Sequence, residues 1–248
     1  MVGLMVLNPK TVSVKPKKFF TLLNRSQNRL SVRRSISMPV RNPPVRLDPP
    51  NPFTLEQGLV INRVHSRNYL GNSFNPGLGS PTRFSPIADV GGKLISTLYA
   101  AGTLEAAIYE TIFHDILAST LRKRVSLQLV LSEAHSKLEV KRSIKLASLR
   151  EPDLMKWRIQ RSDLITTSPK FYASTAKWAE AIHRQFIDIE GLVWTSNQCD
   201  PEAVYLFFGD RVSSDDFRVT LTRDGRISSS FLEDVERVGE RSGIEIVL

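Results

Sequence analysis

The sequence predicts an α+β fold, in which a compact mixed sheet is flanked by helices. Short apolar segments typical of strands recur through residues 51–248, and separate amphipathic segments have helical periodicity. The two kinds of segment do not alternate regularly, as they would in a parallel βαβ sheet. The chain has 248 residues, of which 41% are hydrophobic, so it is long enough for one large domain with a substantial core.

The first 50 residues differ in composition from the rest, and we assign them to a basic extension. They contain ten Lys and Arg residues and one acid, which accounts for the whole formal net charge of +9. The remaining 198 residues hold 24 basic and 24 acidic side chains. Because like charges repel and prolines oppose regular structure, we expect residues 1–50 to be disordered and residues 51–248 to form the folded domain.

Three other interpretations of residues 1–50 stay open. Such a segment can bind nucleic acid or anionic lipid. It is similar to a transit peptide in its excess of Arg and Ser. It is an artefact if translation begins at Met38. The chain has no apolar run of about 18 residues, and its single cysteine, Cys199, cannot form an internal disulfide. We therefore expect a cytoplasmic protein that does not associate with membranes.

The first half of the domain is predicted to combine strands with one helix. The expected segments, in chain order, are a strand at 59–64, a loop at 72–86, a strand at 94–101, a helix from Thr103 to about residue 116, and a strand at 125–131. The loop is dense in Gly, Pro, Ser and Asn, which favour turns. Thr103 can act as a helix N-cap, because its side chain can accept a hydrogen bond from a backbone N–H of the first turn.

The second half is predicted to begin with an amphipathic helix and to end on a strand. The expected segments are a helix from residue 174 or 175, strands at 192–195 and 203–208, a hairpin at 217–227, a helix at 231–241 and a closing strand at 244–248. The hairpin is predicted from the pair Asp224-Gly225, a frequent turn sequence.

Glu110, Arg83 and Arg63 are candidates for chemistry. Glu110 lies between Ile108 and Ile112 on the predicted helix; such an acid is either solvated at the helix edge, the more frequent case, or buried for a function. Arg83, in the Gly- and Pro-rich loop, is either a surface arginine or a ligand for two phosphate oxygens. Arg63 interrupts an apolar strand and faces either water or a cleft.

Tyr99, Ser196 and Asn197 are further candidates. Tyr99 ends a predicted strand and either stacks on a planar ring or belongs to the core. Ser196 and Asn197 follow a predicted strand and are either turn residues or ligand contacts. No metal is expected, because Glu110 and His114 share a helix face without a third ligand in the sequence pattern. No GxSxG, GxGxxG or Walker sequence occurs, which argues against esterase chemistry and a Rossmann site.

Seven short segments, taken together and in order, resemble the RES domain family. They are Arg63–His65, Thr82–Pro86, Thr97–Ala100, Ala106–Asp115, Lys177–His183, Gly191–Ser196 and Phe208–Val212. The family is named for an Arg, a Glu and a Ser. We match the first to Arg83, or alternatively to Arg63, the second to Glu110 and the third to Ser196. The basic extension has no counterpart in the family pattern.

The resemblance implies a fold similar to ADP-ribosyltransferase toxins and the function of a toxin from a bacterial toxin–antitoxin pair. The toxin would degrade NAD as a glycohydrolase or phosphorylase. Glu110, Arg83 and Ser196 would be catalytic, and Arg63, Tyr99 and Asn197 would bind substrate. NAD would be the substrate, and no cofactor is expected. The implied partner is a helix-turn-helix antitoxin, through which alone the protein would contact DNA. A homodimer is left open.

The chemistry that the resemblance implies suits a single carboxylate. Cleavage of the nicotinamide–ribose bond develops positive charge on the ribose, which Glu110 would stabilise. Arg83 and Arg63 would hold the pyrophosphate, and Tyr99 would lie against the nicotinamide or the ribose. The acceptor is water, phosphate or a protein side chain. Two alternatives are transfer of ADP-ribose to a macromolecule and a non-catalytic module that binds an antitoxin.

Overall fold

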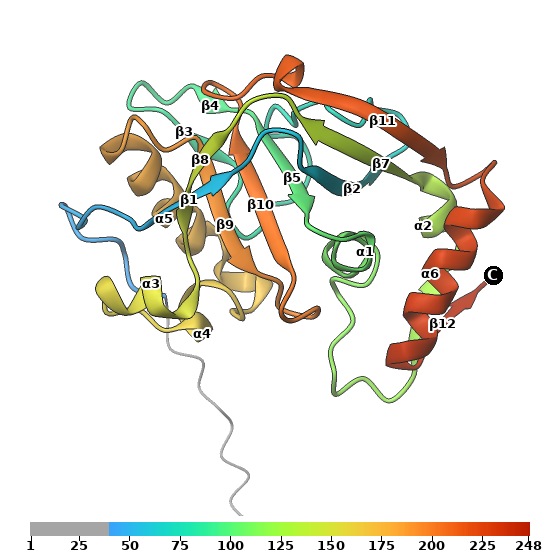
Figure 1. Cartoon of the computed structure of the whole chain (residues 1–248). Helices are drawn as coiled ribbons and strands as arrows, with labels where there is room; N and C mark the ends of the chain where they lie inside the picture. The colour runs from blue at the N-terminus through green and yellow to red at the C-terminus, as the bar shows by residue number, and fades with distance from the viewer. Residues whose placement is uncertain (1–39) are drawn as a thin grey trace, which may run out of the picture. The chain divides into compact units, whose positions relative to one another are not determined.

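The computed structural model describes residues 40–248, in which helices and strands are mixed as expected for an α+β protein (Figure 1). The large sheet contains β1 (Pro52–Leu55), β2 (Val60–Ser66), β5 (Thr97–Ala101), β7 (Glu133–Val140), β8 (Ile144–Ser148), β9 (Gly191–Thr195), β10 (Ala203–Phe208) and β11 (Phe217–Asp224). Two short pairs stand apart, β3 (Ile87–Ala88) with β4 (Leu94–Ile95) and β6 (Lys123–Ser126) with β12 (Ile244–Val247). The helices are α1 (Leu104–Thr111), α2 (Leu127–Ser132), α3 (Glu151–Lys156), α4 (Arg161–Leu164), α5 (Tyr172–Gln185) and α6 (Ser229–Ser242).

The eight strands of the large sheet have the order β1-β8-β9-β10-β5-β2-β7-β11. Neighbouring strands are antiparallel except β8 and β9, which are parallel, so the sheet is mixed as predicted. Near the middle of the sheet, β2 and β5 are joined by little backbone pairing. Strand β2 shares seven register pairs with β7 but only one with β5, in which Asn62 lies opposite Ala101. The sheet therefore has a short seam between β2 and β5.

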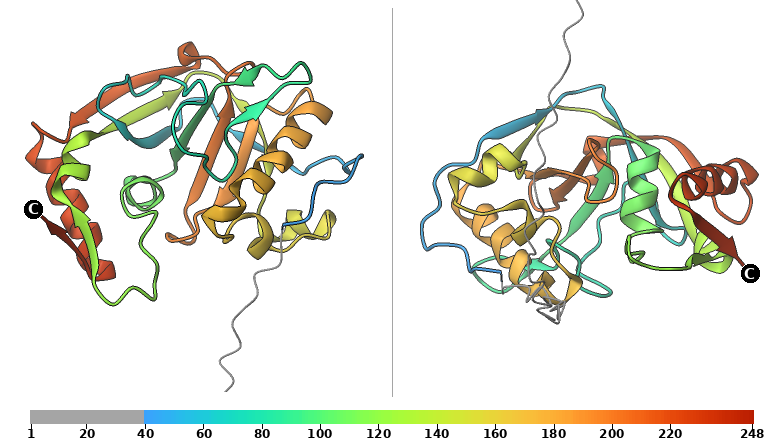
Figure 2. Two further views of the ribbon diagram at one scale, coloured as in Figure 1. Left: turned by 180° about the vertical axis from the view of Figure 1, so that it is seen from behind. Right: turned by 90° about the horizontal axis from the view of Figure 1, so that it is seen from below.

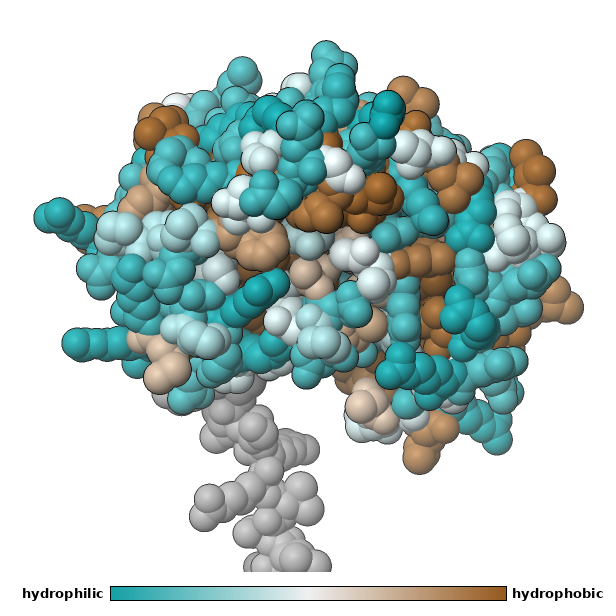
Figure 3. Space-filling model, in the orientation of Figure 1, coloured by the Kyte–Doolittle hydropathy of each residue, from teal (hydrophilic) through white to brown (hydrophobic). Residues whose placement is uncertain are grey.

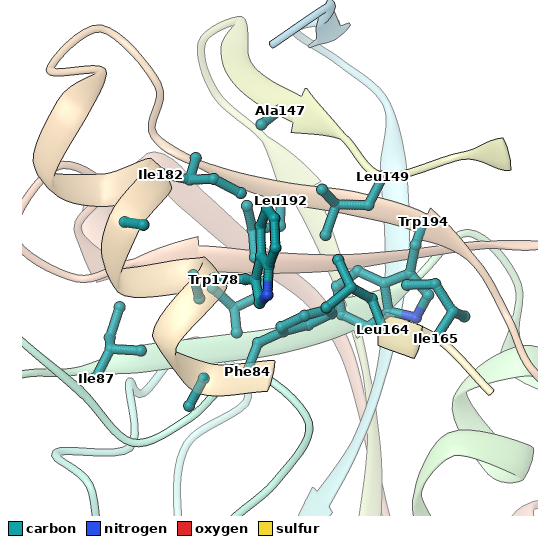
Figure 4. Close-up of a cluster of buried hydrophobic side chains, with 14 of the residues drawn as sticks. Phe84, Ile87, Ala147, Leu149, Leu164, Ile165, Trp178, Ile182, Leu192 and Trp194 are labelled. Atoms are coloured by element: carbon teal, nitrogen blue, oxygen red, sulfur yellow. The ribbon is translucent and has the colours of Figure 1, made fainter. Parts of the chain in front are cut away.

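A hydrophobic core between α5 and the sheet anchors the loop that precedes β3. Alternate residues of β10 face opposite sides, and both sides are buried. In Figure 4, Phe84 lies between Trp178 of α5 and Trp194 of β9. The rings of Phe84 and Trp194 meet edge to face with centroids 5.2 Å apart. Burying an aromatic ring of this size contributes roughly 2–3 kcal/mol, so Phe84 fixes the loop on which Arg83 lies.

A second core joins α1 to α6, and the views from behind and below show α1 between the large sheet and α6 (Figure 2). The helix begins as predicted, because Thr103 accepts a hydrogen bond from the N–H of Ala106 at 3.3 Å. Its predicted end near residue 116 is wrong. The N–H of Phe113 bonds to the carbonyl of Ile108, five residues back, which leaves the helical pattern and buries the Phe113 ring.

Two other predicted segments are wrong. The strand expected at 125–131 ends at Ser126, whose hydroxyl caps α2 by accepting from the N–H of Gln128 at 3.2 Å. A short apolar run is compatible with a strand or a helix, and here the N-cap at Ser126 favours a helix after it. The hairpin expected at 217–227 is a single strand, β11, which pairs with β7 and is followed by α6. Strands β7 and β8 were not predicted.

Residues 40–50, which the sequence assigns to the basic extension, lie against α3 and α5 in the structure. The indole N–H of Trp178 donates to a backbone carbonyl of this segment at 2.8 Å, and Leu47 is 4% exposed. Extended, proline-rich backbone leaves its carbonyls free to accept such bonds. The predictions for residues 1–39, including a start at Met38, lie outside the described residues.

The surface is mainly hydrophilic on the face seen in Figure 3, where apolar residues are exposed in separate patches. Among residues 40–248, no helix combines the length and the hydrophobicity that a membrane crossing needs.

Two buried histidines predict a loss of stability in mild acid. Burial, together with the nearby cations Arg63 and Arg223, lowers the pKa of His65 and of His135 from about 6.5 to about 4. The unfolded chain takes up these protons below pH 6.5, but the folded protein does not until about pH 4. The contribution of these two histidines to the free energy of unfolding should therefore be constant above pH 6.5 and fall between pH 6.5 and 4, by up to roughly 3 kcal/mol per histidine.

Urea unfolding at pH 7.0 and pH 4.5 measures this effect. The variant His135→Gln serves as the matched control, because it removes one of the two titrating groups and should reduce the difference between the two pH values. Equal stability of the wild-type protein at both pH values would contradict the prediction.

Candidate active site

The carboxylate of Glu110, near the end of α1, is fixed by two hydrogen bonds to one oxygen. Its Oε1 accepts from the hydroxyl of Ser196 at 2.6 Å and from the backbone N–H of Asn197 at 3.2 Å. The Ser196 oxygen also accepts from the N–H groups of Gln198 and Cys199, at 3.3 and 3.1 Å. Because the backbone N–H groups of Gln198 and Cys199 are the donors in those two contacts, the hydroxyl proton of Ser196 is free to be donated to Glu110.

Ser196 itself is fully buried and lies behind Glu110 rather than on a cavity wall. A direct contact between Ser196 and substrate stays a prediction. The end of β9 that bears Ser196 is fixed by Arg161 of α4, whose guanidinium donates to the carbonyls of Thr195 and Ser196 at 3.2 and 2.8 Å. Ser196 therefore holds the Glu110 carboxylate in one orientation.

Arg83 faces the other oxygen of the Glu110 carboxylate at a distance of 3.8 Å. Arg83 is 8% exposed, and its guanidinium lies over the ring of Tyr172, 5.6 Å from the centroid. Its Nε has no hydrogen-bond partner among residues 40–248. The backbone carbonyl of Arg83 accepts from the hydroxyl of Thr175, which ties the loop to α5. The guanidinium of Arg83 is therefore fixed in position, but its ion pair with Glu110 is long. Its N–H groups can donate hydrogen bonds to a ligand.

Arg63 of β2 is a second cation of the site, and it is half-buried. One of its terminal nitrogens donates to the carbonyls of Gly71 and Ser73 at 2.7 and 2.6 Å. Burial lowers its pKa to about 10, so the side chain stays charged at neutral pH. Within the part of the chain that the structure describes, no carboxylate forms an ion pair with Arg63. A half-buried cation without a carboxylate partner favours an anionic ligand.

Tyr99 of β5 links the strand to the loop that bears Arg83. Its hydroxyl oxygen accepts from the N–H of Phe84 at 3.1 Å and lies 2.9 Å from the hydroxyl of Thr82. Burial raises the pKa of Tyr99 to about 12, so the hydroxyl stays protonated at neutral pH. The ring stands edge-on to Trp194 with centroids 6.1 Å apart. Tyr99 thus presents its ring to the cavities while its hydroxyl fixes the loop.

Two adjoining cavities open at these residues. The smaller, of about 290 Å³, is lined by Glu110, Arg83 and Tyr172, and the larger, of about 400 Å³, follows the loop after β2. Four residues line both cavities, so the cavities meet at Arg63, Val64, Thr82 and Tyr99. Their combined size lies in the range of small-molecule sites. The arrangement places one oriented carboxylate and two cations around two adjoining cavities.

Most of the residues predicted from sequence come together here. Glu110, Arg83 and Ser196 form one connected group, and Arg63 and Tyr99 line both cavities. The side chain of Asn197 lines neither cavity, and the residue contributes its backbone N–H to Glu110. In residues 40–248, no group of three or more His, Cys, Asp or Glu side chains gathers as a metal site would require.

Sequence reasoning missed three residues of the site: Tyr172, Thr175 as a contact of the Arg83 loop, and Arg161. Tyr172 and Thr175 lie in the first turn of α5, where the sequence shows an ordinary helix start. Arg161 lies on a four-residue helix and looks like a surface cation. Each acts on a residue far away in the chain, so no local pattern could have identified it.

Comparisons with known proteins identify the family and the fold of the chain. A family model described as "RES domain" matches residues 60–226. A search of curated proteins found no match. Among solved structures, the chain is similar to a chain of the MbcT–MbcA toxin–antitoxin complex of M. tuberculosis, with a TM-score of 0.52 and 12% identity. The likeness covers 74% of this chain and 92% of the other. At this identity it establishes a common fold.

Proposed function

This chain belongs to the RES domain family, and on that basis we propose that it is a toxin of a toxin–antitoxin pair that cleaves the nicotinamide–ribose bond of NAD. The observation that carries the proposal is the Glu110 carboxylate, oriented by Ser196 and Asn197 at the wall of a cavity that is also lined by two arginines. Glu110 is the only acid among the described residues that line this cavity.

The geometry suits loss of nicotinamide through a positively charged ribose. As the bond between the ribose C1′ and the ring nitrogen breaks, its electron pair stays with nicotinamide, which leaves as a neutral molecule. No general acid is therefore needed. The positive charge that develops on the ribose is stabilised by a fixed carboxylate in a cavity of low dielectric. Glu110 supplies the negative charge. When water is the acceptor, its oxygen bonds to C1′ and releases one proton; an ionised phosphate oxygen bonds to C1′ without releasing one.

The two cations and the shape of the site suit the rest of a dinucleotide. Arg63 lies where the two cavities meet, and Arg83 lines the smaller one. A diphosphate held by Arg63 and Arg83 would place one nucleoside in each cavity. The ribose that carries nicotinamide would then lie beside Glu110, and Tyr99 would stand against its ring or sugar.

The test is incubation of the purified full chain with NAD, followed by chromatography of the products. Release of nicotinamide is the expected result. Free ADP-ribose would identify water as the acceptor, and phosphorylated ADP-ribose in phosphate buffer would identify phosphate. Label from adenine-labelled NAD on protein or nucleic acid would instead identify a transferase. No release of nicotinamide by a folded protein would overturn the proposal and favour a non-catalytic binding module.

The proposed partner is a helix-turn-helix antitoxin that inhibits the site. The fold neighbour was solved as a toxin–antitoxin complex, which supports a protein partner of this kind. DNA would be contacted through the antitoxin, because positive charge is concentrated in residues 1–50 and residues 51–248 carry none in excess. Addition of the cognate antitoxin should stop the release of nicotinamide.

Ser196→Ala should lower kcat while changing KM little. The variant removes a hydrogen bond to the charged carboxylate and leaves the Asn197 N–H as its remaining donor from this segment. A hydrogen bond to a charged group contributes roughly 1.5–3 kcal/mol, which corresponds to about a tenfold to hundredfold loss of kcat. Initial rates of nicotinamide release measure the effect. Ser162→Ala, an exposed serine on α4, is the control. A Ser196→Ala protein with the wild-type kcat would show that Glu110 needs no such support.

A further inference from the structure

Arg63 and Glu110 lie on opposite sides of the seam between β2 and β5, and α1 also contacts β2 through the Thr111 hydroxyl, which donates to the carbonyl of Val64 at 3.4 Å. Arg63 lies on β2, whereas β5 leads through Gly102 into α1, which carries Glu110. The two strands share one register pair, Asn62 opposite Ala101. Backbone pairing at this point is therefore a weak constraint on how the two halves of the site meet.

The side chain of Asn62 crosses this seam. Its amide nitrogen donates to the carbonyl of Gly102 at 3.1 Å, and Asn62 is 8% exposed. Gly102 directly precedes Thr103, the N-cap of α1. The Asn62 amide thus ties the strand that bears Arg63 to the start of the helix that bears Glu110.

His135 of β7 sets the orientation of that amide. His135 is fully buried, and its Nδ1 accepts from the guanidinium of Arg223 at 3.0 and 3.2 Å. Because an arginine can only donate, the imidazole proton must lie on Nε2. Nε2 then donates to the amide oxygen of Asn62 at 3.0 Å, which leaves the amide nitrogen directed to Gly102.

The far end of this chain of hydrogen bonds is fixed by α6. Arg223 forms an ion pair with Asp234 of α6 at 2.8 Å and lies over the ring of Phe231, 5.6 Å from the centroid. The His135 ring is stacked on the same Phe231 ring, with centroids 6.0 Å apart. Helix α6 begins at Ser229, beyond the segment that the RES family model matches.

We propose that His135 and Asn62 are positioning residues, anchored through Arg223 to α6, that hold α1 and its Glu110 in place relative to Arg63. The proposal rests on the proposed function. His135 lines neither of the two cavities of the site, so its effect on catalysis is exerted through Asn62 and the helix. Loss of this relay should lower the rate, because small displacements of a catalytic group reduce rates strongly.

His135→Met and His135→Gln separate positioning from packing. Methionine fills the space but cannot donate to Asn62, whereas the amide of glutamine can. His135→Met should lower kcat for nicotinamide release by about tenfold to a hundredfold and leave KM within about threefold, since Arg63 and Arg83 still bind the dinucleotide. His135→Gln should restore most of kcat. A wild-type kcat in His135→Met, an equal loss in both variants, or a loss confined to KM would overturn the proposal.

Hydrogen–deuterium exchange tests the relay without reference to activity. In full-length His135→Met, the amides of residues 103–111 should exchange faster than in the wild type, while those of α5 should not change. Unchanged exchange in residues 103–111 would overturn the proposal. If the wild type releases no nicotinamide, the proposed function fails and the exchange result alone decides on the relay. If His135→Met does not fold, Asp234→Asn, at the far end of the relay, is expected to show the same changes at smaller size.

Discussion

Glu110→Gln should lower kcat for nicotinamide release by on the order of a hundredfold to a thousandfold without lowering stability. The amide has nearly the size and shape of the carboxylate, and its oxygen can still accept from Ser196 and Asn197. It cannot supply the negative charge that stabilises the ribose cation. KM should change little, because the arginines that hold the diphosphate remain.

Initial rates of nicotinamide release over a range of NAD concentrations measure this effect. Glu105→Gln is the matched control: Glu105 lies in the first turn of α1, forms an ion pair with Arg241 and lines neither cavity. It should retain the wild-type kcat. A folded Glu110→Gln protein with more than a tenth of the wild-type kcat would remove Glu110 from the centre of the mechanism.

Arg63→Lys should raise KM for NAD by roughly tenfold to a hundredfold, from the loss of charge-assisted hydrogen bonds of about 1.5–3 kcal/mol. The carbonyls of Gly71 and Ser73 already take one terminal nitrogen of the guanidinium, at 2.7 and 2.6 Å. Lysine keeps the charge, but its single ammonium cannot serve both this loop and a phosphate group. The kcat should stay within a few-fold of the wild type, because Glu110 is untouched.

Titration calorimetry with NAD separates binding from chemistry in this variant. Combining Arg63→Lys with Glu110→Gln slows turnover during the titration, and the Kd of the double variant should exceed that of Glu110→Gln alone by a similar factor. Arg67→Lys is the control, since Arg67 forms an ion pair with Asp224 and lines neither cavity. An Arg63→Lys protein that lowers kcat and leaves Kd unchanged would contradict a role in holding the diphosphate.

Local signals in the sequence predicted the parts of the fold that depend on local contacts. The start of α1 was predicted because Thr103 caps its own first turn. Strand β7 was not predicted, since Glu133, His135 and Ser136 make it look polar. His135 and Ser136 are buried through partners on other strands, Asn62 and Thr222 among them. Such long-range pairing compensates for burial of polar groups and leaves no periodic pattern in the strand itself.

In the candidate site, too, local sequence signals predicted less than the long-range contacts reveal. Arg83, Glu110 and Ser196 were each ambiguous alone and became informative through their order along the chain. The contact that defines the site, Ser196 with Glu110, joins residues 86 positions apart. Tyr172 and Arg161 were missed for the same reason, because their partners are brought to them by α5, α4 and β9. The sequence predicted which side chains carry the chemistry. Only the tertiary structure shows that Ser196 orients the carboxylate of Glu110.

The most direct test of the account is the cellular NAD level after induced expression of the wild-type chain and of Glu110→Gln, at matched protein levels. The account predicts that the wild type empties the NAD pool and stops growth, whereas Glu110→Gln does neither. An NAD pool that both folded proteins leave intact, or that both deplete equally, would contradict cleavage of NAD centred on Glu110.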